Sequence, residues 1–182
     1  MRKSILGILC FVGGLLTVPL LGYVYLRFGA PPVAVTDTAF PLEKQIVHVP
    51  LHARIAREMP GAAPIAGTPQ TLLAGAAIYQ EHCAFCHGLP GSPAAIGKHM
   101  YPAAPGLWVS HRPGVVGVSD DPVGESYWKV KNGIRLAGMP AYADLLSEQQ
   151  MWQVSLLVKS ADHPLSPELA AALKPAPQAG AR

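Results

Sequence analysis

The sequence Cys83-Ala84-Phe85-Cys86-His87 decides the fold of this 182-residue chain, because it places two thiols and an imidazole within about one helical turn. Two cysteines at this spacing can each form a thioether with one vinyl group of a porphyrin. The histidine directly after the second thiol then lies beneath the iron as an axial ligand. We therefore predict one covalent haem c, attached through Cys83 and Cys86, with His87 as the proximal iron ligand.

Three other uses of a C-x-x-C pair fit this sequence poorly. A thioredoxin-like redox pair follows a strand-helix-strand pattern, which is not visible before Cys83. A structural zinc site needs two further ligands at finger-like spacing, and the chain has no second cysteine pair. A disulfide between residues three apart is strained and adds little stability. The haem attachment remains the favoured interpretation.

The sixth iron position needs a second ligand from downstream of His87. Met139 lies in Gly138-Met139-Pro140, a constrained loop between two predicted helices, where a thioether can be held against an iron. Met151 lies on the apolar face of a predicted helix and is more simply a core residue. On the residues alone Met139 leads and Met100 is the main alternative; the remaining candidates are His99, His111 and His163.

Helices surround the C-x-x-C-H motif in the sequence. Thr68-Pro69 is a helix start, and the predicted helix runs into the cysteines. A second helix is predicted over 125–132, ended by Gly133, and a third over 147–160, begun by a capping box. Residues 88–124 are rich in glycine and proline and show no strand alternation. The predicted fold class is therefore all-α.

The N-terminal region contains one apolar segment long enough to cross a membrane. The mostly apolar run Ile5–Leu26 spans 22 residues, or about 33 Å as a helix. This exceeds the apolar part of a secretory signal peptide, and Arg2 and Lys3 precede it. We predict that residues 1–27 form an uncleaved anchor with its N-terminus in the cytoplasm and the rest of the chain outside.

Composition divides the remaining chain into three parts. Residues 28–67 are a proline-rich linker with a short helix over 51–58, after Pro50. Residues 68–160 are predicted to form the haem domain. Residues 161–182 are an Ala/Pro-rich flexible tail in which 168–174 form at most a marginal helix.

The basic net charge of +3 reflects membrane topology. Of 14 basic residues, Arg2, Lys3 and Arg27 flank the apolar segment, so residues 28–182 carry 11 basic and 11 acidic side chains. A neutral domain of this kind argues against a nucleic-acid partner.

These segments resemble membrane-anchored, monohaem class I c-type cytochromes of bacteria. The resemblance covers about residues 68–160 and rests on residues 73–79 leading into the C-x-x-C-H motif, on residues 127–142, and on the helix containing Trp152. It implies a class I cytochrome c-like helical domain wrapped around one haem, with Met139 as the distal iron ligand. It also implies a helix crossing that pairs Gly75 with Trp152, and a proline carbonyl, from Pro105 or Pro102, that accepts the His87 N–H.

The resemblance further implies a function. We expect an electron carrier, not an enzyme, in the bacterial inner membrane with its haem domain in the periplasm. It would pass single electrons between redox protein partners that the sequence does not name. Two alternatives remain: a haem subunit of a larger dehydrogenase or oxidase complex, and a haem enzyme or sensor with an open sixth position. The residues expected to line the haem pocket are Phe85, Leu107, Trp108, Tyr127, Trp128 and Ile134.

Overall fold

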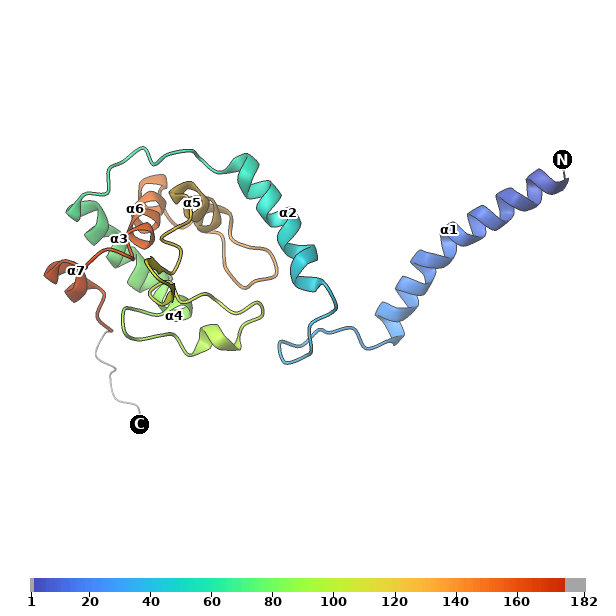
Figure 1. Ribbon diagram of the computed structural model, residues 1–182, viewed down its shortest axis with the longest axis horizontal. Coiled ribbons are helices and arrows are strands. Elements are labelled where there is room, and N and C mark those ends of the chain that lie inside the picture. Colours follow the sequence, from blue (N-terminus) through green and yellow to red (C-terminus); the bar gives the residue numbers. More distant parts are fainter. Residues whose placement is uncertain (1, 176–182) are drawn as a thin grey trace. The chain divides into compact units, whose positions relative to one another are not determined.

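Helices make up most of the regular structure in the computed structural model, which describes residues 2–175 (Figure 1). The chain divides into two compact units, Met1–Val47 and His48–Arg182. The first unit contains α1 (Arg2–Phe28) and the start of α2 (Glu43–Glu58). After α2, the second unit contains α3 (Pro69–His82), α4 (Ala84–His87), the 3-10 helix η1 (Ile96–His99), α5 (Val123–Asn132), α6 (Glu148–Lys159) and α7 (Pro167–Ala172).

One small hairpin departs from the all-α expectation. Strand β1 (Ser110–Arg112) pairs antiparallel with β2 (Val115–Val116). These strands have 3 and 2 residues, too few for an alternating pattern to appear in the sequence. The described chain is therefore mostly helical, with this hairpin in the loop between η1 and α5.

The expected N-terminal apolar helix is present as α1. Its segment Phe11–Phe28 has a mean hydropathy of 1.5, and none of that segment is buried within the protein. By length and composition α1 is therefore able to cross a membrane.

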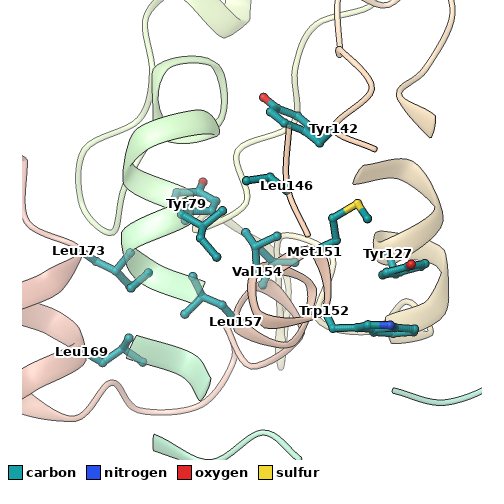
Figure 2. Packing of buried hydrophobic residues seen from close by; sticks show 13 residues of the cluster. Tyr79, Tyr127, Tyr142, Leu146, Met151, Trp152, Val154, Leu157, Leu169 and Leu173 are labelled. Atoms are coloured by element: carbon teal, nitrogen blue, oxygen red, sulfur yellow. The ribbon is translucent and has the colours of Figure 1, made fainter. Parts of the chain in front are cut away.

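The core of the second unit forms where α3 crosses α6. A Cβ atom at Gly75 would collide with the backbone of Gln153 and lie 3.2 Å from the Leu157 Cβ, so only glycine allows this approach. The residue that meets Gly75 is thus Gln153 rather than the expected Trp152. Trp152 instead stacks on Tyr127 of α5, with ring centroids 4.0 Å apart and an interplanar angle of 13° (Figure 2).

The helix boundaries follow the local signals in the sequence. The Thr68 hydroxyl accepts from the Thr71 backbone N–H and begins α3. Ser147 and Gln150 form both hydrogen bonds of the predicted capping box at the start of α6. Gly133 ends α5, as expected.

The segment after α6 is not wholly a flexible tail. Leu169 and Leu173 are buried in the core, 6% and 1% exposed (Figure 2). The Gln80 side chain of α3 donates hydrogen bonds to the carbonyls of Ala172 at 2.8 Å and Lys174 at 2.7 Å. The marginal helix expected over 168–174 is thus present as α7, and its buried leucines show that this part of the segment is not flexible, contrary to expectation. Residues 176–182 of that tail lie outside the described part of the chain.

The linker helix is longer than the sequence suggested. Helix α2 runs through Pro50 from Glu43 to Glu58, whereas we expected it to begin after that proline. A proline removes one helical hydrogen bond, yet the helix extends on both sides of Pro50. Ile55 is 2% exposed, and the Glu58 carboxylate accepts a 3.0 Å hydrogen bond from the Trp128 indole of α5.

Candidate functional site

The two thiols of the C-x-x-C-H motif lie on one tight turn, residues 83–87, which we call the attachment turn. Cys83 ends α3, and the backbone N–H groups of Cys86 and His87 donate to its carbonyl at 3.1 and 3.0 Å. Both cysteines are half-buried and form no disulfide with each other. Burial, with a smaller contribution from Cys86, raises the pKa of the Cys83 thiol to about 12, so this thiol is neutral at physiological pH. The turn thus presents two reduced sulfurs three residues apart.

The His87 imidazole is held by one of the two proline carbonyls that the sequence left open. Its Nδ1 lies 2.8 Å from the Pro105 carbonyl oxygen. Because a carbonyl only accepts, Nδ1 carries the proton, and Nε2 keeps its lone pair. Burial lowers the pKa of His87, opposed by the Pro105 hydrogen bond, and so favours the neutral ring. A neutral imidazole with a fixed tautomer and an available Nε2 is a suitable metal ligand.

Two tyrosine hydroxyls brace this turn from either end. The buried Tyr79 donates to the Gly88 carbonyl at 2.8 Å, just after His87. Tyr142 donates to the His82 carbonyl at 2.8 Å, just before Cys83. Neither hydroxyl was assigned a role from the sequence, because the Tyr142 bond spans 60 residues and the Tyr79 bond joins a helix to the loop nine residues on, and neither leaves a recognisable local pattern. The attachment turn is therefore fixed by side chains from both sides.

Met139 lies on a short loop after α5, residues 134–140, which we call the Met139 loop. The Ile134 N–H donates to the Met139 carbonyl at 3.2 Å, and the Ala137 N–H donates to the Ile134 carbonyl at 3.2 Å. Met139 itself is half-buried, while Leu136 at the tip of the loop is 87% exposed. Since Tyr142 follows this loop and bonds to His82, the loop and the attachment turn are tied together.

The expected pocket residues divide into two groups. Leu107, Trp108 and Ile134 are half-buried, consistent with a partly covered site. Phe85 is 76% exposed. Tyr127 stacks on Trp152, and Trp128 bonds to Glu58, so both contribute to packing between elements. The expectation that these residues line a haem pocket stays a prediction.

The Trp108 indole nitrogen is buried and has no hydrogen-bond partner in the described part of the chain. Its ring lies edge-on to Tyr79, with centroids 5.7 Å apart. A buried N–H without an acceptor is unfavourable, so this donor suits a bound group that brings an acceptor of its own.

Comparison with known proteins identifies the segment that contains the site. Residues 70–156 match the family described as "Cytochrome C oxidase, cbb3-type, subunit III". Neither the curated proteins nor the solved structures gave a match. The matched segment contains the attachment turn, the Met139 loop and most of α6. Domains of this kind carry covalent haem c, and the donors present fit that group: two thiols, an imidazole with an available nitrogen, a thioether and an unpartnered indole N–H.

Proposed function

Residues 70–156 form a cytochrome c domain, and on that premise we propose that the chain carries single electrons on the periplasmic face of a bacterial inner membrane. Cys83 and Cys86 would hold one haem c through thioether bonds, and His87 and Met139 would bind its iron. The bond from His87 to Pro105 carries the proposal, because it orients the imidazole and leaves Nε2 for the iron.

The bound haem supplies an iron that gains and loses one electron. The chain's own residues set the conditions for that transfer. Cys83 and Cys86 fix the group on a turn that Tyr79 and Tyr142 brace, so the surroundings move little between redox states. The Met139 thioether favours the reduced form and raises the reduction potential.

The Met139 loop also bears on whether this protein is an electron carrier or a haem enzyme. A methionine that occupies the sixth position leaves no site where a substrate or gas can bind. The loop's own backbone bonds and its tie through Tyr142 support a closed arrangement. The chain therefore acts by passing electrons to protein partners and not by transforming a bound molecule.

Helix α1 is the proposed membrane anchor. It is an apolar helix near the N-terminus whose sequence begins with Arg2 and Lys3, ahead of the apolar run. Basic residues before a membrane helix remain in the cytoplasm, which directs the cytochrome domain to the periplasm. An uncleaved helix would keep the domain close to membrane-bound partners.

A second candidate function is suggested by the family match. The matched family is described as a subunit of a cytochrome oxidase, so this chain is alternatively the electron-delivering subunit of a membrane oxidase complex. Mild detergent extraction followed by size-exclusion chromatography distinguishes the two. Elution as a monohaem protein of the chain's own mass supports a carrier, and co-elution with a larger haem protein supports the subunit.

The proposed ligation is tested on the holoprotein by optical spectroscopy. We expect the oxidised protein to show the methionine-sulfur-to-iron charge-transfer band, and the reduced protein not to bind carbon monoxide. Absence of that band together with rapid carbon monoxide binding would establish an open sixth position and support a haem enzyme or sensor.

A further inference from the structure

Met100, which the sequence offered as an alternative iron ligand, contacts the Met139 loop. A Cβ atom at Gly138 would lie 2.8 Å from the terminal methyl Cε of Met100, so this methyl rests on the Gly138 backbone. Gly138 directly precedes Met139 and has φ +73°, a conformation that favours glycine. The Met100 side chain thus lies against the residue that leads into the proposed ligand.

Met100 is itself fixed to the opposite part of the site. It directly follows η1, which packs on α4, the turn that contains Cys86 and His87. Gly97 of η1 lies so close to the Cys86 carbonyl that a Cβ atom there would collide with it. The Gly97 carbonyl also accepts a 3.0 Å hydrogen bond from the Ala104 N–H. Met100 therefore connects the attachment turn with the Met139 loop.

Backbone hydrogen bonds hold the Met139 loop mainly at its ends. Within it, the Ile134–Met139 and Ala137–Ile134 bonds are 3.2 Å long, and after it the Tyr142 and Ala143 N–H groups donate to the Val130 and Lys131 carbonyls of α5 at 3.0 and 3.3 Å. The Tyr142 hydroxyl bond to His82 also lies beyond the loop. At the tip of the loop, Leu136 is 87% exposed, whereas Ala137, directly before Gly138, is half-buried. The methyl contact of Met100 is thus a side-chain restraint placed directly beside Met139.

We propose that Met100 is a positioning residue that keeps the Met139 loop closed, and thereby limits access of external ligands to the iron. The inference rests on the proposed function, in which Met139 is the sixth ligand. Loss of the Met100 methyl increases the population of loop-open molecules, in which an external ligand replaces the Met139 thioether. The role depends on the length and shape of Met100 and not on a bond from its sulfur to iron.

The test is imidazole binding to the oxidised, full-length holoprotein. We expect Met100→Ala to bind imidazole about fivefold more tightly, through a larger open population. Met100→Leu fills a similar volume and restores affinity to within about twofold of the unaltered protein. Met59→Ala is the matched control, since Met59 is also half-buried but lies after α2, and it leaves imidazole binding unchanged. If Met100→Ala does not accumulate, Met100→Val replaces it. Valine also lacks the terminal methyl, so this variant should likewise bind imidazole about fivefold more tightly.

The charge-transfer band of the same proteins separates failure of this inference from failure of the proposed function. If Met139→Ala loses the band but Met100→Ala binds imidazole like the unaltered protein, the inference is wrong and the ligand assignment stands. If Met139→Ala keeps the band and Met100→Ala loses it, Met100 is the ligand and both proposals fail. If Met100→Leu binds imidazole as tightly as Met100→Ala does, the packing role of Met100 is contradicted.

Discussion

The attachment turn and the Met139 loop face the same proposed haem, but they are held in different ways. The turn is bound on every side: backbone bonds to the Cys83 carbonyl, the Pro105 carbonyl on His87, and two tyrosine hydroxyls at its ends. The loop has two internal backbone bonds of 3.2 Å, is joined to α5 after its end by the Tyr142 N–H at 3.0 Å, and has an exposed tip at Leu136. Local opening is easiest where few buried contacts hold the backbone. We therefore expect reactivity at the iron to change through the loop, while the turn determines whether holoprotein forms.

The largest effect should come from removing the thiols of the turn. Replacing both Cys83 and Cys86 with alanine should abolish covalent haem, because no thioether can then form. Haem staining after denaturing electrophoresis measures this directly. Phe85→Ala is the matched control, since Phe85 lies on the same turn but is 76% exposed, and it should retain full staining. Covalent haem in the double variant would exclude this turn as the attachment site.

Changing the loop should keep the haem but alter its properties. Met139→Ala should lower the reduction potential on the order of 0.1–0.2 V, because the thioether no longer stabilises the reduced iron. Potentiometric titration measures the shift, and carbon monoxide should now bind the reduced protein. Met151→Leu, a conservative change of a core methionine that is 3% exposed, should leave both properties unchanged. An unaltered potential in Met139→Ala would show that the sixth ligand lies elsewhere.

Two glycines with similar positive φ angles, Gly88 in the turn and Gly138 in the loop, allow the rigidity of the two regions to be compared. Gly88 has φ +76°, and a Cβ atom there would lie 2.7 Å from the Ala94 backbone nitrogen. Gly138 has φ +73°, but its added Cβ would meet only the flexible end of Met100. Gly88→Ala should therefore lower the free energy of unfolding by about 3 kcal/mol and Gly138→Ala by about 1 kcal/mol.

Denaturant unfolding of the two holoproteins measures this difference. A methionine end can move by rotating about its side-chain bonds, whereas a backbone nitrogen within a turn cannot move without displacing its neighbours. Equal losses of unfolding free energy for the two glycine variants would mean that the loop is as rigid as the turn. That result would contradict the expectation that the loop opens more easily.

The sequence predicted those parts of the site that depend on local spacing. The C-x-x-C-H motif, the Thr68 cap, the Ser147 capping box and the stop at Gly133 are each contained within a few residues. Their geometry follows from helical periodicity, so no tertiary information is needed. The choice of Met139 needed the family resemblance, because spacing alone also allowed Met100.

Some features that the sequence did not predict depend on contacts between distant segments, and others on local bonds that the sequence pattern did not reveal. Composition suggested a free tail, yet Leu169 and Leu173 are buried because Gln80 and its helix provide a surface for them. Pro50 suggested a helix break, yet α2 begins at Glu43, whose carboxylate accepts a 2.7 Å hydrogen bond from the Phe40 N–H. Tertiary packing overrode the local preference in the tail, whereas a local bond accompanies the earlier start of α2.

The smallest expected effects come from removing the hydroxyls of the two tyrosines that hold the ends of the turn, and these effects should differ between the two. Tyr79→Phe and Tyr142→Phe each remove one hydroxyl and leave a carbonyl without its donor, which should lower the free energy of unfolding by about 1–2 kcal/mol. Only Tyr142 also lies directly after the Met139 loop and ties it to His82. Tyr142→Phe should therefore increase imidazole binding by the oxidised protein about twofold, whereas Tyr79→Phe should leave it unchanged. If Tyr79→Phe increases imidazole binding and Tyr142→Phe does not, access of imidazole to the iron is controlled from the attachment turn. The Met139 loop is then not the more easily opened of the two regions.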